Sequence, residues 1–280
     1  MLWLNNNKYK LALLDTNALS DLLMSTQSWL KYVDKKFGLD KTMLGCSIFT
    51  LSELCYSKPL FNKYLELFSV FPSVIFDGYD SIFRKEIANY DKKPVEINPI
   101  VIAPCALNDN TIKVPKERLE KVLSAAGFLI KTNEWRMKRR EILNGILSLR
   151  KNYPAKGNGY TKEQIEEFVF LVTMDQIFFR DAKFAEDHIN KQRNSIDIKK
   201  FPSVISSSYV VFYKFYPDNR TPILSDVFDI MISSLFPYVE IVITEKHLCE
   251  IIRKVKNSHG FFPNLEYYSL SELKNEIRNA

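Results

Sequence analysis

Short, mostly apolar runs alternate with stretches of helical spacing near both ends of the chain. The runs that predict buried strands are residues 11–14, 73–76, 239–244 and 265–268. Short apolar runs of this kind are typical of strands that are covered on both faces of a parallel sheet. Helical spacing predicts helices over about 19–33, from 50, and over about 60–68, 80–90, 225–236, 245–256 and from 271. The alternation predicts an α/β fold, with a parallel sheet flanked by helices.

The middle of the chain has a different pattern. Four prolines occur between residues 91 and 115, and proline interrupts helices. Three long helical patterns follow, over about 116–131, 134–152 and 162–190. These patterns predict a mostly helical insertion at 92–205, which separates an N-terminal part of the core (1–91) from a C-terminal part (206–280).

Composition places the chain among ordinary globular proteins. It has 280 residues, of which 46% are hydrophobic, so it can bury a sizeable core. Its four cysteines are scattered and form no Cys-x-x-Cys motif, so we expect neither a structural zinc nor disulfides. Scattered thiols fit a reducing compartment, and no apolar run approaches the roughly 20 residues that a membrane helix needs. We therefore expect a cytoplasmic protein without a membrane segment.

Acidic residues follow the predicted strands or open the helices beside them. Asp15 comes directly after the first strand, and Glu245 directly after the strand at 239–244. Glu53 opens the second helix, while Asp226 and Asp229 lie in the first turns of the helix before the later strand. Ligands bind beyond the carboxyl ends of parallel strands, and carboxylates suit Mg²⁺ or Mn²⁺. One or two such ions can activate water for phosphodiester hydrolysis and stabilise the leaving oxygen.

The residues from Leu13 to Leu19, L-L-D-T-N-A-L, resemble the opening motif of the PIN-domain nucleases. Three further segments resemble the later motifs of that family. They are T-L-S-E-L at 50–54, D-I-M-I-S-S at 229–234 and V-I-T-E at 242–245. Their order and spacing match the family, although Glu245 stands where the family usually has Asp. The resemblance covers roughly residues 10–90 and 220–270, and it leaves the helical insertion uncovered.

The resemblance implies a PIN-like fold and a metal-dependent nuclease that usually acts on RNA. The implied catalytic residues, which also bind Mg²⁺ or Mn²⁺, are Asp15, Glu53, Asp229 and Glu245. Asp226 is a further candidate ligand, because it lies three residues before Asp229 and so on the same helical face. Asn17 and Thr244 would support the site by hydrogen bonds. RNA is the favoured partner and DNA the alternative, and an antitoxin or a defence-system component is a candidate protein partner.

Each acidic residue also has a local explanation. Asp15 or Asn17 is a suitable N-cap for the first helix, and Thr50-x-x-Glu53 has the pattern of a capping box. The other three acids lie near helix N-termini, where the helix dipole favours negative charge. On this interpretation the chain is a non-catalytic module that binds RNA or a protein. The combination and order of the acids favour the metal site.

The predicted insertion carries a basic segment. Between residues 131 and 162 there are nine bases and two acids, a net charge of 9 − 2 = +7, against +6 for the whole chain. Trp135, Tyr153 and Tyr160 are interleaved with the bases. Basic residues can neutralise phosphates and aromatic rings can stack on unpaired bases, whereas the alternative is a solvated helix face. The candidate nucleic-acid-binding residues are Arg136, Lys138, Arg139, Arg140, Arg150 and Lys151.

Overall fold

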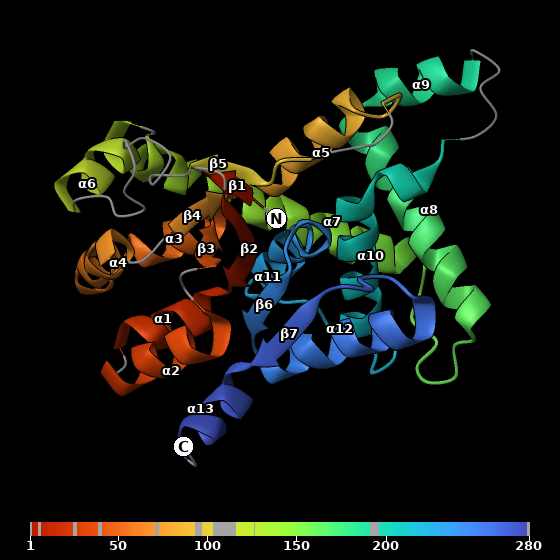
Figure 1. The fold of residues 1–280 in the computed structure, drawn as a ribbon. Coiled ribbons are helices and arrows are strands. Elements are labelled where there is room, and N and C mark those ends of the chain that lie inside the picture. The colour runs from red at the N-terminus through yellow and green to blue at the C-terminus, as the bar shows by residue number, and fades with distance from the viewer. Residues whose placement is uncertain are drawn as a thin grey trace.

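A computed structural model describes residues 2–4, 7–24, 27–38, 41–70, 73–92, 97–102, 116–125, 127–190 and 196–278. Six strands form a mixed, mostly parallel sheet in the order β5-β4-β3-β2-β6-β7 (Figure 1). The parallel strands are β2 (Asn7–Leu14), β3 (Thr42–Ser47), β4 (Ser73–Phe76), β6 (Ile241–Thr244) and β7 (Glu266–Ser269). β5 (Ile100–Ile102) is antiparallel to β4, and β1 (Leu2–Leu4) is antiparallel to the start of β2. The sheet confirms the predicted α/β class.

The direction in which the sheet is built reverses beside β2. From β2 the chain adds β3 and then β4 on one side, and much later adds β6 and then β7 on the other. In open parallel sheets the connections that leave the strands at such a switch point diverge and leave a crevice for ligands. Asp15 follows β2 and Glu245 follows β6, and these two strands are hydrogen-bonded neighbours. The topology therefore brings the two acids that follow strands to the switch point.

The strands are buried on both faces because their side chains alternate between two hydrophobic cores. In β2, Leu11 and Leu13 belong to the first core, whereas Ala12 and Leu14 belong to the second. The first core also holds side chains of α5 (Tyr79–Ala88), α8 (Lys162–Arg180), α10 (Pro202–Phe215), α11 (Asp226–Ser233) and α12 (Lys246–His259). The second holds side chains of α1 (Thr16–Met24), α2 (Gln27–Phe37), α4 (Lys58–Val70), α6 (Lys116–Ala125) and α13 (Leu270–Arg278). No described helix combines the length and apolar composition that crossing a membrane requires.

The segment 92–205, which we predict to be a helical insertion, shares the first core with the sheet. α6, α7 (Phe128–Asn152), α8 and α9 (Ala182–Asn190) lie in this range, together with β5 and a short 3-10 helix (Ile198–Lys200). Ile146 of α7 and Phe168 of α8 belong to the same buried cluster as Leu11 and Leu13 of β2. The predicted boundary at 205/206 falls within α10. Residues 103–115, which include two of the four prolines, lie outside the described residues.

Several predicted helices have other boundaries. The single helix predicted at 19–33 is wrong, because α1 and α2 are separate helices. The helix predicted at 162–190 is also two helices, because the Asp181 side chain accepts the Phe184 amide (2.9 Å) and begins α9. The break predicted at about residue 132 lies instead at Gly127, whose positive φ of 65° ends the helical path.

Two elements near the site, β3 and α10, were not predicted. Gly45 interrupts the apolar pattern of β3, and the glycine is required there by close packing. A Cβ atom on Gly45 would lie 2.4 Å from Phe76 Cε2 and 2.8 Å from the Val74 carbonyl oxygen. In α10, buried serines conceal the apolar pattern, and the hydroxyls of Ser207 and Ser208 donate to the Val204 carbonyl.

A buried carboxyl in the first core predicts a pH-dependent stability. Glu86 of α5 is completely buried, and it accepts hydrogen bonds from the amide and hydroxyl of Ser203 (2.7 and 2.6 Å) and from the Tyr238 hydroxyl. Burial raises the pKa of Glu86 from 4.5 to about 7, although these hydrogen bonds lower it in part. The folded state therefore holds this proton at a higher pH than the unfolded state. The free energy of unfolding should fall by up to about 3 kcal/mol from this group as the pH rises from about 4.5 to about 7.

Glu86→Gln is expected to remove that part of the pH dependence. The glutamine can still accept from the Ser203 amide and from Tyr238, and its amide can donate to the Ser203 hydroxyl. Urea unfolding of both proteins at about pH 5 and about pH 8 tests the expectation. The variant should be the more stable protein at the higher pH, and equal pH slopes for the two proteins would contradict the assignment.

Candidate functional site

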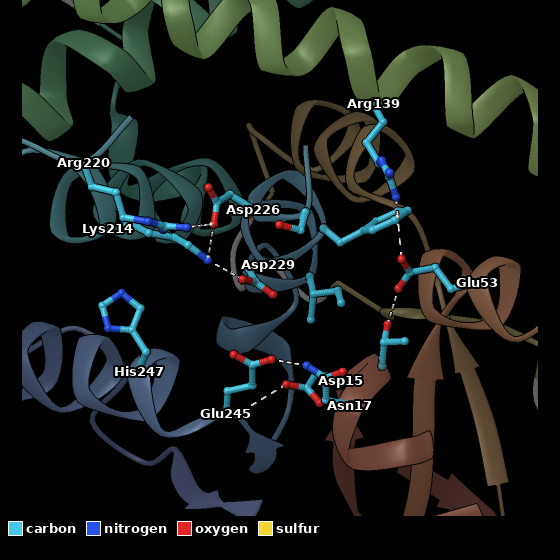
Figure 2. A pocket seen from close by; sticks show the side chains of 14 residues that line it. Asp15, Asn17, Glu53, Arg139, Lys214, Arg220, Asp226, Asp229, Glu245 and His247 are labelled. Atoms are coloured by element: carbon cyan, nitrogen blue, oxygen red, sulfur yellow. Dashed lines mark hydrogen bonds and ion pairs between the residues drawn. The ribbon is translucent and has the colours of Figure 1, made fainter. Parts of the chain in front are cut away.

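A cavity of about 590 Å³ lies at the switch point of the sheet (Figure 2). Five carboxylates line it, all of them predicted from the sequence: Asp15, Glu53, Asp226, Asp229 and Glu245. They come from the end of β2, from α3 (Ile48–Leu54), from α11 and from the start of α12. The predicted supporting residue Asn17 also lines the cavity. The tertiary structure therefore brings the predicted acidic set to one place.

Asp15 is the most enclosed of the acids that follow a strand. Its Oδ1 accepts the Ala18 amide (2.6 Å), so it caps α1, as the local explanation predicts. Its Oδ2 accepts the Glu245 amide (3.1 Å) and the Thr244 hydroxyl, so it also ties the end of β2 to the end of β6. Thr244 therefore makes the supporting contact that we predict. Burial raises the pKa of Asp15 to about 6; the Thr244 hydroxyl and the Ala18 amide lower it, and the charge of Asp229 raises it further.

The capping-box explanation of Glu53 is wrong. α3 begins at Ile48, two residues before the predicted start, and its N-cap is Ser47, whose hydroxyl oxygen accepts the Thr50 amide (3.1 Å). Glu53 therefore lies at the sixth position of the helix, beyond the reach of a capping box.

The Glu53 carboxylate is directed into the cavity. It accepts the Thr16 hydroxyl (2.5 Å) and lies 3.6 Å from Arg139 Nη1. Burial raises the pKa of Glu53, the Thr16 hydrogen bond and the Arg139 charge lower it, and the charge of Asp229 raises it. Asp229 thus acts electrostatically on both Asp15 and Glu53, which are contributed by separate elements.

The two acids of α11 have different environments. The Asp226 side chain is 4% exposed and accepts the Ile223 amide (2.9 Å), Arg220 Nη2 (2.8 Å) and Lys214 Nζ (3.1 Å). Burial would raise the pKa of Asp226, but the Ile223 amide and the two cations lower it below its usual value. The Asp229 side chain is 29% exposed and pairs with Lys214. Asp229 is therefore the acid that faces Asp15 and Glu53, whereas Asp226 is held by structural partners.

Glu245 is exposed at the rim of the cavity. It is the N-cap residue of α12, but its side chain makes no capping hydrogen bond. Its Oε1 instead accepts the Asn17 side-chain amide, so the predicted supporting residue orients this acid. Glu240 precedes β6 and accepts the Leu11 amide (2.8 Å) at the opposite end of the strand. It does not line the cavity.

Basic side chains line the same cavity, and three of these residues were not predicted. Lys214 of α10, Arg220 after α10 and His247 of α12 lie on the side away from Glu53 (Figure 2). Lys214 had a detectable signal, because it interrupts the apolar run at 209–216, and a lysine that is buried in such a run needs an anionic partner. Arg139, which we predicted as a nucleic-acid contact, reaches the cavity from α7 and lies 4.4 Å from the centre of the Phe228 ring.

The other predicted nucleic-acid contacts are spread along α7. Lys138, Arg140 and Lys151 are exposed, and Lys138 lies 3.6 Å from Asp80. Arg150 donates to the Arg220 carbonyl (2.8 Å) and to the Asn219 side chain, so it holds the loop that carries Arg220.

The two tyrosines of the basic segment give less support to a stacking surface. Tyr153 and Tyr160 are partly buried and pack against the first core. The Arg136 and Trp135 side chains lie outside the described residues. The exposed bases of α7 remain as the candidate nucleic-acid surface.

The donor set suits a hard divalent cation in its chemistry. Five carboxylates and three side-chain cations line the cavity, a formal balance of 3 − 5 = −2. The ligating atoms on offer are carboxylate oxygens, which Mg²⁺ and Mn²⁺ prefer. Among the described residues, however, no three acidic, histidine or cysteine side chains form a group that could hold a metal ion. In this arrangement Glu53, Asp229 and Glu245 are each engaged by a protein partner, namely Thr16, Lys214 and Asn17.

Comparison of the chain with protein-family models, with curated proteins and with solved structures finds no match. The fold class is therefore the α/β class that the sheet itself defines. A fold class does not determine an activity, so the functional argument depends on the residues of the cavity.

Proposed function

We propose that the chain is a PIN-like, metal-dependent nuclease that hydrolyses phosphodiester bonds in RNA. The observation that carries the proposal is the convergence of five carboxylates from four separate elements on one cavity at the switch point. Local capping accounts for Asp15, and ion pairs engage Asp226, Asp229 and Glu53. Neither explanation requires that Glu53, Asp229 and Glu245 face the same space.

Asp15, Glu53, Asp229 and Glu245 would hold Mg²⁺ or Mn²⁺. When bound, the ion supplies activation of water and neutralises charge on the leaving oxygen. The protein's own contribution is to orient the ligands. Thr244 and the Ala18 and Glu245 amides hold Asp15, Thr16 holds Glu53, and Asn17 holds Glu245. Asp229 would exchange its ion pair with Lys214 for the cation.

Positive charge beside the cavity supports a polyanionic substrate. Arg139 lines the cavity from α7, which passes above the carboxylates in Figure 2, and its neighbours in the chain, Lys138 and Arg140, are exposed. Lysine and arginine side chains neutralise backbone phosphates irrespective of sequence. The preference for RNA over DNA rests on the resemblance of the motifs to the PIN-domain nucleases.

A second candidate function is a non-catalytic module that binds RNA or a protein. The observation in its favour is that, among the described side chains, the acids are paired with protein partners and form no three-membered group for a metal. Metal dependence separates the two functions.

The first test measures cleavage of a labelled single-stranded RNA and of the matching DNA, in Mn²⁺ and in EDTA. We expect cleavage in Mn²⁺, with RNA preferred, and none in EDTA, because carboxylates alone neither lower the pKa of the attacking water nor neutralise charge on the leaving oxygen. Calorimetric titration with Mn²⁺ gives a readout that does not depend on finding the right substrate. A protein that neither binds Mn²⁺ nor cleaves would favour the non-catalytic module.

A further inference from the structure

One side of the cavity is lined by cationic residues that have no role in the proposed metal-dependent hydrolysis. Lys214 and Arg220 lie there with His247, opposite Glu53 and Arg139 (Figure 2). The positive charges of Lys214 and Arg220 would repel a metal ion, whereas they would attract an anionic ligand.

Lys214 is the most buried cation on this side of the cavity. Its side chain is 6% exposed, and its ammonium group contacts both Asp226 (3.1 Å) and Asp229. A buried ammonium is retained only with anionic partners. Asp226 is already neutralised by Arg220 at 2.8 Å and hydrogen-bonded by the Ile223 amide. If Asp229 turns to a divalent cation, two side-chain cations share one carboxylate, and one positive charge is left for another anion.

Arg220 is held in position from outside the cavity. Arg150 of α7 donates to the Arg220 carbonyl (2.8 Å) and to the side chain of Asn219, which has a positive φ of 47°. These contacts shape the loop while leaving the Arg220 side chain 39% exposed. Its described hydrogen bond uses Nη2, and a guanidinium carries five N–H donors in all. Arg220 can therefore bind an incoming anion without releasing Asp226.

The start of α12 adds donors on the same side. Glu245 and His247, at the N-cap and in the first turn, both line the cavity, and the Glu245 side chain makes no capping hydrogen bond. The first amides of a 14-residue helix carry partial positive charge and favour phosphate.

We propose that Lys214, Arg220 and the first turn of α12 form a binding site for the phosphate group of a nucleotide. The cavity volume of about 590 Å³ is enough for a nucleotide as well as for a cation. The inference rests on the proposed function in one respect: a cation on the acids takes Asp229 from Lys214. The cation and the phosphate should therefore bind with positive coupling, each raising the affinity for the other.

The test compares the binding of adenosine 5′-monophosphate and of adenosine by calorimetry, with and without Mg²⁺. The two probes differ only in the phosphate. The nucleotide is expected to bind at least about ten-fold more tightly than the nucleoside, and more tightly with Mg²⁺ than without. Inorganic phosphate, added as a competitor, shows how much of the affinity comes from the phosphate group alone.

Arg220→Gln is the main variant, because Arg220 is partly exposed and glutamine can still donate to Asp226. It should weaken nucleotide binding about ten-fold or more without weakening the binding of Mg²⁺ alone, because it removes a positive charge that opposes the metal. Lys214→Met is the second variant, with thermal unfolding as a check of its fold. The matched control is Arg253→Gln, which removes an exposed arginine of α12 that does not line the cavity.

The outcomes separate this inference from the proposed nuclease. Nucleotide affinity that is equal in the wild type and Arg220→Gln, or equal for nucleotide and nucleoside, would overturn the phosphate site whether or not Mg²⁺ binds. Nucleotide binding that depends on Arg220 in a protein that takes up no Mg²⁺ would support the phosphate site and contradict the metal-dependent nuclease. An equal loss in Arg220→Gln and Arg253→Gln would mean that only overall charge matters, which also overturns the site.

Discussion

Asp15→Asn is expected to lower the rate of RNA cleavage by about a thousand-fold or more. Metal-ion catalysis supplies several kcal/mol of transition-state stabilisation, and each 1.4 kcal/mol or so is worth about ten-fold in rate. Of the four proposed ligands, Asp15 is the most firmly positioned, with three described donors from Ala18, Thr244 and Glu245. The measurement is single-turnover cleavage of labelled RNA in Mn²⁺, together with calorimetric titration of Mn²⁺ into the variant.

The same variant should fold with little loss of stability. The asparagine oxygen can still accept the Ala18 amide and cap α1, while its amide faces the Thr244 hydroxyl, which can turn and accept. The Glu245 amide loses its acceptor, which costs about 1 kcal/mol. Because burial raises the pKa of Asp15 from 3.8 to about 6, the free energy of unfolding falls as the pH rises through that range, and an uncharged side chain removes this penalty.

The control for Asp15→Asn is Asp218→Asn, which neutralises an exposed acid that does not line the cavity. The control should cleave RNA at the wild-type rate. Cleavage by a folded Asp15→Asn protein at more than about a tenth of the wild-type rate would falsify the proposed role of Asp15.

Asp226→Asn is expected to lose stability and Asp229→Asn to lose metal binding, although the two residues lie only three positions apart on α11. Asp226 is buried against Lys214 and Arg220, so its neutralisation breaks a charge-assisted contact with each of them and leaves the buried Lys214 with the partly exposed Asp229 as its one described anionic partner. We expect a loss of about 3 kcal/mol or more in the free energy of unfolding. Asp229 is partly exposed, and Lys214 keeps Asp226 as its partner when Asp229 is neutralised. Asp229→Asn should therefore cost less than about 1 kcal/mol.

For metal binding, Asp229→Asn is expected to have the larger effect of the two variants. Asp229 acts electrostatically on Asp15 and Glu53, so its neutralisation should weaken Mn²⁺ binding and cleavage by about a hundred-fold or more. Urea unfolding and Mn²⁺ titration of the two variants, measured side by side, test both halves. If Asp226→Asn loses Mn²⁺ while keeping its stability, the assignment of the two aspartates has to be exchanged.

The sequence predicts most of the sheet because local pattern carries the signal. β4 and β6 are short apolar runs, and burial on both faces leaves little room for polar residues in such strands. β3 was not predicted because Gly45 interrupts its apolar pattern. The glycine is required by close packing against Val74 and Phe76, which are distant in the chain. α10 was not predicted because it contains a run of serines. Their hydroxyls donate hydrogen bonds to backbone carbonyls of the same helix, so these polar residues can be buried in the core.

The acids of the site were also predictable, because two of them are marked by their position directly after a predicted strand. Asp15 and Glu245 each come directly after a buried strand, and the carboxyl ends of parallel strands meet at one edge of the sheet. The sequence could not predict how these acids are paired. Glu53 has the pattern of a capping box, yet Ser47 takes the capping role once β3 leads into α3 at Ile48.

The sequence by itself therefore determined the α/β class, the strand ends that carry the acids and the identity of the acidic set. These features depend on spacing and on turn chemistry within about a dozen residues. Only the tertiary structure decided that Asp229 faces the cavity while Asp226 is neutralised, and that Lys214 and Arg220 form a cationic side to the pocket. Those assignments depend on charge pairing and burial in the assembled core, where the energy of a charge is set by neighbours that local sequence does not specify.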